Sequence, residues 1–161
     1  MARSEPAPNV TLSVFDRLID NEPAARTDSA QGRSQSLRQL KIALRRDLEW
    51  LLNTRRSVLE VKDSTLQVER SLFNYGLPDL SSLGVHSVQD QKRLLWMIES
   101  AIATFEPRIA DARVSMEQVA GSARVLRFQI QGLLRLDPAP ERVTFDTVLE
   151  LTSGEYAVKG E

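Results

Sequence analysis

The chain has 161 residues, of which 42% are hydrophobic and 27% are charged, and its formal net charge is −1. A chain of this length can bury a core of its own, and a charge near zero provides no global attraction to nucleic acid or to an anionic membrane. The lack of cysteine excludes disulfides, thiolate metal sites and a cysteine nucleophile, and the single histidine, His86, excludes a multi-histidine metal site. No apolar run approaches the ~20 residues of a membrane helix, and MARSEPAPNV has no secretory h-region, so we expect a cytoplasmic protein without membrane insertion.

The N-terminal region divides into a tail, a short helix and a linker. Residues 1–10 are polar and contain prolines, which predicts a disordered tail, and residues 21–33 have the small, polar composition of a linker. Between them, residues 11–20 predict an amphipathic helix with Ser13 and Asp16 spaced as a capping pair. Its apolar positions are Leu12, Phe15, Leu18 and Ile19. Because so short a helix is marginal in water, we expect it to dock on the main domain or on a partner.

The region 34–161 predicts a single α+β domain, with helices first and strands second. One helix begins at the capping residue Ser36 and runs to about Arg55, and another begins at Ser87 and ends before Pro107. Their core-facing residues are predicted to be Leu37, Leu40, Leu44, Leu48 and Leu51 in the first helix, and Leu94, Ile98, Ala101, Ile102 and Phe105 in the second.

Two tryptophans, Trp50 and Trp96, lie off these core stripes. Aromatic side chains are common anchors at protein interfaces. We therefore expect both indoles to be available for contacts outside the core, with a second packed layer as the alternative, particularly for Trp50.

From residue 110 onward, apolar residues recur at every second position. This alternation predicts strands over residues 110–117, 123–134 and 143–152, and Tyr156 and Val158 predict a short fourth strand. The connections are short, which is typical of antiparallel neighbours. We therefore expect an antiparallel sheet of three to four strands with the helices packed on one face.

The sequence offers little support for catalysis. His86 has no recognisable nucleophile or orienting carboxylate, and the glycine-rich phosphate motifs and G-x-S-x-G are absent. Glu99 and Glu106 share a helix, but nothing marks a sugar-binding cleft, so we expect both to be solvated. Carboxylates interrupt the basic residues and aromatic residues are only 6%, which argues against nucleic-acid binding. We expect no catalytic, cofactor-binding or metal-binding residues.

The triplet Glu106-Pro107-Arg108 follows the predicted second long helix. Its simplest interpretation is a helix terminator. However, Pro107 fixes the direction of the chain, and a carboxylate at a helix C-terminus is not favoured by the helix dipole. A basic group of a partner, or Arg108 itself, would offset this charge. We expect an exposed recognition corner in the free chain.

Four ordered segments together resemble the TssE family, the wedge component of type VI secretion baseplates, which is similar to a small wedge subunit of contractile phage tails. The resemblance covers roughly residues 12–158. Its motifs are Phe15-Asp16-Arg17-Leu18, the segment from Ser36-Leu37 through Asp47 to Arg55, the segment from Asn74 to Leu80, and Ile98-Glu99 through Glu106-Pro107-Arg108.

The resemblance implies a structural subunit of a cytoplasmic baseplate docked at the inner-membrane complex. It would link the wedge subunits TssF, TssG and TssK to the sheath proteins TssB and TssC and help to initiate sheath assembly. The strands at 123–134 and 143–152 would offer a sheet edge to sheath strands. The implied partner-binding residues are Leu12, Phe15, Asp16, Arg17, Leu18, Ile19, Glu106, Pro107 and Arg108.

Two other functions remain as alternatives. The family has carried a "lysozyme-like" label, so one alternative is a muramidase that cleaves peptidoglycan, although the carboxylates of this chain give the label no support. The other is a regulatory protein-binding module, because an anti-adaptor protein of bacterial stress regulation shares the fold.

Overall fold

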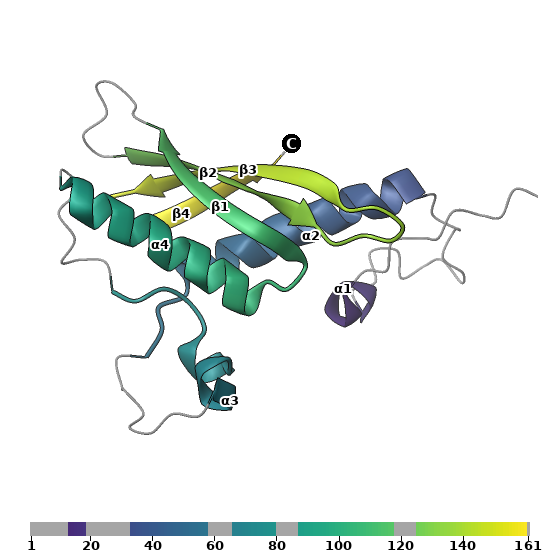
Figure 1. Cartoon of the computed structure of the whole chain (residues 1–161), viewed down its shortest axis with the longest axis horizontal. Helices are drawn as coiled ribbons and strands as arrows, with labels where there is room; N and C mark the ends of the chain where they lie inside the picture. The colour runs from purple at the N-terminus through teal and green to yellow at the C-terminus, as the bar shows by residue number, and fades with distance from the viewer. Residues whose placement is uncertain (1–12, 19–32, 58–65, 80–86, 118–124, 161) are drawn as a thin grey trace, which may run out of the picture.

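The computed structural model describes residues 13–18, 33–57, 66–79, 87–117 and 125–160 (Figure 1). The predicted tail, nearly all of the linker, Leu12, Ile19 and His86 lie outside these ranges. The helical elements are α1 (Val14–Leu18), α2 (Arg33–Asn53), α3 (Leu66–Glu69), the 3-10 turn η1 (Leu72–Asn74) and α4 (Val88–Phe105). The strands are β1 (Ile109–Glu117), β2 (Val125–Leu134), β3 (Glu141–Glu150) and β4 (Glu155–Gly160).

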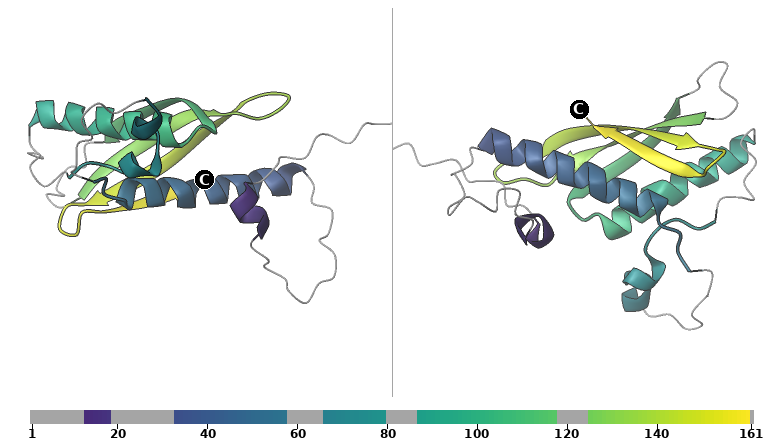
Figure 2. Two further views of the ribbon diagram at one scale, coloured as in Figure 1. Left: turned by 90° about the horizontal axis from the view of Figure 1, so that it is seen from below. Right: turned by 180° about the vertical axis from the view of Figure 1, so that it is seen from behind.

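The four strands form one antiparallel sheet in the order β1-β2-β3-β4. Figures 1 and 2 show α2 and α4 on the same side of this sheet, with α4 beside β1 and α2 beside β4. The predicted α+β class, the antiparallel sheet and the packing of helices on one face are confirmed. None of the described helices combines the length and apolar character needed to span a bilayer.

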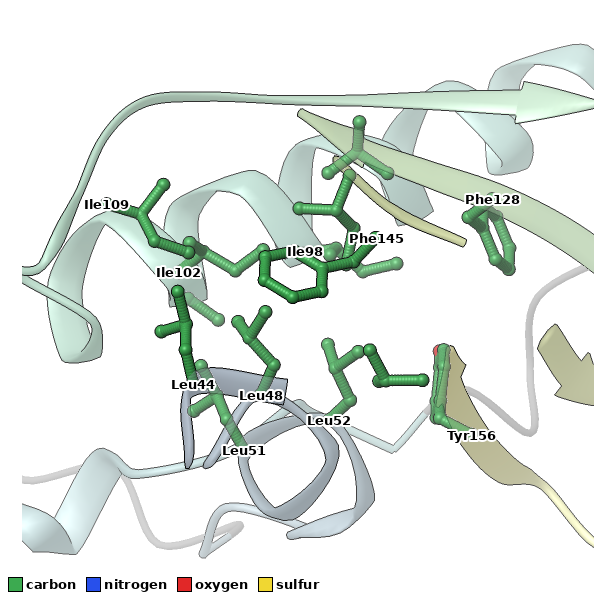
Figure 3. Packing of buried hydrophobic residues seen from close by; sticks show 14 of the residues in the cluster. Leu44, Leu48, Leu51, Leu52, Ile98, Ile102, Ile109, Phe128, Phe145 and Tyr156 are labelled. Atoms are coloured by element: carbon green, nitrogen blue, oxygen red, sulfur yellow. The ribbon is translucent and has the colours of Figure 1, made fainter. Parts of the chain in front are cut away.

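The hydrophobic core fills the space between the two long helices and the sheet. In Figure 3, Leu44, Leu48 and Leu52 of α2 face Ile98 and Ile102 of α4, with aromatic side chains of the sheet beside them. The predicted helix stripes are buried, apart from partly buried residues at their ends, Leu37 and Phe105. The inward positions of the strands also match the predicted alternation; the fully buried ones include Phe128, Ile130, Val143, Phe145, Leu149, Tyr156 and Val158.

Local capping explains where α4 begins and ends. The Asp90 N–H donates to Ser87 Oγ at 3.2 Å, which confirms the predicted N-cap. The helix ends at Phe105, because Pro107 disfavours the helical conformation in the residue before it. In contrast, α2 begins at Arg33, so the predicted start at Ser36 is wrong: Ser36 lies inside the helix and is buried.

The first strand contains an irregularity that simple alternation does not reveal. The register of β1 against β2 shifts between Ala110 and Arg113, and Asp111 has a φ of 52°. Such a bulge inserts one extra residue, and it places Ile109 rather than Ala110 in the core. The burial of Ile109 was therefore missed by the alternation that predicted the rest of the strand.

The expected roles of the strands in edge pairing need correction. The strands at 123–134 and 143–152 were expected to offer an edge, but they correspond to β2 and β3, which are the two central strands. β2 pairs with both β1 and β3, and β3 pairs with β2 and, over Phe145–Glu150, with β4. The edges of the sheet are β1 and β4.

Candidate protein-binding site

The helix α1 is fixed at its start by the predicted capping pair. The Asp16 N–H donates to Ser13 Oγ at 3.1 Å, and the Ser13 hydroxyl donates back to the Asp16 carboxylate. This arrangement directs the other oxygen of Asp16 toward α2, where it accepts a hydrogen bond from Arg46 Nη2 at 2.8 Å. The short helix thus docks on α2 through its own capping residue.

Aromatic contacts add to this ion pair. The Arg46 guanidinium lies 5.3 Å from the ring centroid of Phe15 and 4.9 Å from that of Trp50. The two rings also meet edge to face, with centroids 6.2 Å apart. A cation over aromatic faces is attracted by their quadrupoles, so Arg46 joins α1 to α2 by charge and by stacking.

A second arginine joins the corner after α4 to the same helix. Arg108 Nε donates to Glu106 Oε1 at 2.6 Å, and Arg108 Nη2 donates to Glu106 Oε2 and, at 2.6 Å, to Asp47 Oδ2. Asp47 Oδ1 accepts from Arg46 Nη2 at 2.8 Å. Asp47 therefore bridges the two arginines, and the residues form one continuous ion-pair network: Asp16, Arg46, Asp47, Arg108 and Glu106.

The expectation of an exposed Glu106–Arg108 pair in the free chain is wrong. Glu106 is only 5% exposed, and the Arg108 side chain is 25% exposed. Arg108 folds back onto the corner, so it supplies the cation that the carboxylate at the end of α4 needs. One donor is left over: Arg108 Nη1 is buried and has no hydrogen-bond partner among the described residues.

The charges in this network shift the pKa values of the side chains around them. Burial alone would raise the pKa of Asp16, but the hydrogen bond from Ser13 and the charge of Arg46 outweigh it and hold that pKa below its usual value. The hydrogen bonds of Arg108 to Glu106, and then to Asp47, raise the pKa of the guanidinium. Burial, and then the nearby carboxylates of Asp47 and Glu106, raise the pKa of Tyr75. The arginines therefore stay charged at all physiological pH values.

The network leaves apolar surface exposed around it. Val14, Phe15 and Leu18 of α1 are exposed, as are Ile42 and Trp50 on the outer side of α2. The described contacts of α1 with α2 are made by Asp16 and Phe15, so Val14 and Leu18 remain available for another partner. We call Val14, Phe15, Leu18, Ile42 and Trp50 the arm surface.

The structure thus brings two segments that are far apart in the sequence into one site. Of the residues singled out from the sequence, Phe15, Asp16, Glu106 and Arg108 meet through α2; Leu18 is exposed nearby, and Pro107 forms the corner. The side chain of Arg17 and the residues Leu12 and Ile19 lie outside the described part.

Arg46 and Asp47 were missed as site residues. Their partners lie 30 and 61 positions away in the chain, and no local periodicity reports such pairs. One feature of the sequence could have indicated them: Trp50 lies one helical turn beyond Arg46 and off the core stripe.

The paired-carboxylate interpretation finds no geometric support. Glu99 was expected to be solvated, but its Oε1 accepts a hydrogen bond from the Val114 N–H at 2.8 Å, and Glu106 is neutralised by Arg108. The described cavities beside α2 and α4 are lined by neither carboxylate. Within the described residues, no group of three or more His, Cys, Asp or Glu could hold a metal ion.

A comparison with protein-family models identifies the family of this chain. The model of the baseplate wedge protein gp25 matches residues 38–139, nearly two thirds of the chain. The chain belongs to the baseplate wedge gp25 family. The match covers α2 from Arg38 onward, α4, the corner at Glu106-Pro107-Arg108, β1 and β2, whereas α1, β3 and β4 lie outside it. No curated protein and no solved structure matches the chain.

Membership of the gp25 family is consistent with a site made of ion pairs and exposed apolar side chains. A baseplate wedge protein partners with other baseplate proteins in a phage-tail-like assembly. The protein therefore has a structural role in a phage-tail-like baseplate. The family match covers all residues of the ion-pair network except Asp16.

Proposed function

We propose that this protein is the TssE-like wedge subunit of a type VI secretion baseplate, located in the cytoplasm at the inner-membrane complex. It joins the wedge subunits TssF, TssG and TssK to the sheath proteins TssB and TssC and helps to start sheath assembly. The observation that carries the proposal is the ion-pair network from Asp16 to Glu106, which holds an exposed apolar helix beside the corner in a gp25-family chain.

The arm surface supports docking to helical partners. Val14 and Leu18 lie one turn apart on α1 and are both exposed, as expected for a helix that presents apolar side chains to another helix. The charged network below holds α1 near the corner, so a partner that binds the arm surface also reaches Glu106-Pro107-Arg108. The side chains proposed to bind partners are those of Leu12, Phe15, Asp16, Arg17, Leu18, Ile19, Glu106, Pro107 and Arg108.

Co-purification of the full chain with the other wedge subunits tests the proposal. Phe15→Asp places a charge in the arm surface and is expected to abolish co-purification, while the melting midpoint changes little because Phe15 is 54% exposed. Val88→Asp is the matched control, because Val88 is also an exposed apolar residue but lies at the other long helix. Normal co-purification of Phe15→Asp would contradict the proposal.

A purely structural role also predicts that the protein does not cleave peptidoglycan. Incubation with purified peptidoglycan is expected to release no muropeptides. Release that is lost in Glu99→Gln or Glu106→Gln would favour the muramidase alternative instead.

A further inference from the structure

A groove that is separate from the arm surface lies along α4. It has a volume of about 510 Å³ and is bounded by α4 on one side, and by Arg56 and the segment Asn74–Asp79 on the other. The polar and large apolar lining residues of α4 recur at short helical intervals: Arg93, Trp96, Met97, Ser100 and Thr104. This spacing forms one continuous stripe along the helix, ~16 Å long at a rise of 1.5 Å per residue.

Backbone hydrogen bonds fix the wall opposite α4. The Leu77 N–H donates to the Thr54 carbonyl at 2.8 Å, and the Arg56 N–H donates to the Leu77 carbonyl at 2.9 Å. Gly76 permits this close approach, because its φ is 103° and a Cβ there would lie 2.2 Å from the Thr54 carbonyl oxygen. The segment Asn74–Asp79 is therefore attached to the chain that follows α2, and the groove is formed before any partner binds.

The groove carries positive charge that the described residues do not compensate. Arg56 and Arg93 are exposed, and neither forms an ion pair within the described part of the chain. Asp79 also lines the groove, but its carboxylate accepts from Arg55 Nη1 at 2.8 Å. The two arginines are therefore available to carboxylates of a partner.

Trp96 provides an exposed apolar group between these charges. Its side chain is 66% exposed, and covering an indole of this size is strongly favourable. Half-buried Met97 lies beside it, and Phe105 packs against Tyr75 with ring centroids 5.3 Å apart, which fixes the end of the groove. Tryptophan and arginine are the residues most often found as energetic hot spots of protein interfaces.

The shape and the charge together indicate the occupant. A straight stripe of about three helical turns is complemented by a second helix, whose residues three and four apart lie on one face. The arginines favour a helix that carries carboxylates beside its apolar residues. Nucleic acid fits less well, because Trp96 is the one exposed ring among the described lining residues and the chain has a net charge of −1.

We propose that this groove, which we call the α4 groove, binds an acidic amphipathic helix of a partner subunit. Trp96 contacts the apolar side of that helix, and Arg56 and Arg93 pair with its carboxylates. The proposal rests on the proposed baseplate function and adds a second docking surface, on α4 rather than on α1 and α2. It also gives a role to the segment from Asn74 to Leu80, which the arm surface does not use.

Hydroxyl-radical footprinting of the full chain, free and within the purified complex with wedge and sheath subunits, tests this assignment. In the complex, oxidation of Trp96 is expected to fall at least fivefold. Unchanged oxidation of Trp96 in a complex that forms would overturn the assignment while leaving the baseplate function intact. Failure of the complex to form with the unmodified chain would instead contradict the baseplate function itself.

A pair of charge reversals isolates the groove from the overall charge. Arg93→Glu changes a lining residue, whereas Lys92→Glu changes its exposed neighbour, which does not line the groove. Both variants change the net charge equally. Titration calorimetry with the purified wedge and sheath subunits is expected to show at least a tenfold loss of affinity for Arg93→Glu and less than a twofold loss for Lys92→Glu. Equal affinities would contradict the proposal, and melting curves confirm that both variants are folded.

The dependence on salt gives a further measurement of the same contact. The affinity of the unmodified chain is expected to fall more steeply with NaCl concentration than that of Arg93→Glu, because exposed ion pairs are screened. Parallel salt dependences would contradict pairing of Arg93 with carboxylates.

Two other occupants are examined with the free chain. Binding of a fluorescein-labelled oligonucleotide that is weakened by Arg93→Glu but not by Lys92→Glu would assign the groove to nucleic acid. A dimer in sedimentation that Trp96→Ala dissociates would assign it to a second copy of the chain. Either result would overturn the proposal, which predicts a monomer that does not bind the oligonucleotide through Arg93.

Discussion

The inner side of α2 places Leu44, Leu48 and Leu51 in the core, whereas its outer side carries Ile42, Arg46 and Trp50. The inner contacts are apolar and fully enclosed between the helices and the sheet. The outer contacts are ion pairs and ring contacts with α1 and with the corner after α4. Helix α2 thus stabilises the fold through its inner side. Its outer side carries ion pairs and ring contacts that we expect a partner subunit to replace with contacts of its own.

The largest effect is expected on the inner side. Leu48→Ala removes a side chain that is fully buried and leaves a cavity, so the free energy of unfolding is expected to fall by ~3 kcal/mol. Urea denaturation of the variant and of the unmodified chain measures this difference. Ile42→Ala, an exposed aliphatic residue of the same helix, is the control and is expected to change stability by less than ~0.5 kcal/mol. Equal losses in both variants would contradict the distinction between the two sides.

A substitution at the corner after α4 is expected to have an intermediate effect on the free energy of unfolding. Arg108→Ala leaves Glu106 buried without its cation, and the expected loss of stability is ~2 kcal/mol, less than for a fully buried pair because Arg108 is partly exposed. Adding Glu106→Gln is expected to recover part of the loss. Lys41→Ala breaks a more exposed ion pair, that with Glu141, and is expected to cost under ~1 kcal/mol. A melting curve unchanged by Arg108→Ala would show that the pair contributes nothing to the free chain.

The inner and outer sides of α2 also differ in how well the sequence predicts them. Periodicity located α2, α4 and the strands, because burial imposes a spacing of 3.6 on helices and of 2 on strands. It could not show that Asp47 reaches Arg108, since the pair depends on how α2 packs beside the corner. It also missed the bulge at Asp111, and it assigned the edges to central strands because the order of strands in a sheet is a tertiary property.

The docking of α1 is expected to depend on pH. The pKa of Asp16 lies below 3.8, the ordinary value of an aspartate side chain, so the ion pair with Arg46 stabilises the docked arm above that pH. This contribution, under ~1 kcal/mol, is lost as the pH falls from 3.8 through the lowered pKa. The emission of Trp50 in a Trp96→Phe variant reports the contact with Phe15 and measures this transition. A matching titration in Asp16→Asn would show that another group is responsible.

The smallest effects concern the two tryptophans, whose predicted exposure is confirmed. Trp50 is 51% exposed and Trp96 is 66% exposed. In single-tryptophan variants, acrylamide is expected to quench both, and Trp96 more strongly, because Trp50 contacts Phe15 and Arg46. When the wedge complex forms, quenching of Trp50 is expected to fall. Equal quenching of Trp50 in the free and assembled states would place the interface elsewhere.

The role of the outer side of α2 in assembly is tested most directly by one variant, for which both stability and affinity are measured. Arg46→Ala removes the cation that joins Asp16 to Asp47 and stacks on Phe15 and Trp50. We predict that the free energy of unfolding falls by no more than ~1 kcal/mol, while the affinity for the purified wedge subunits, measured by titration calorimetry, falls at least tenfold. An unchanged affinity, or a loss of stability as large as that of Leu48→Ala, would contradict the assignment of this surface to assembly.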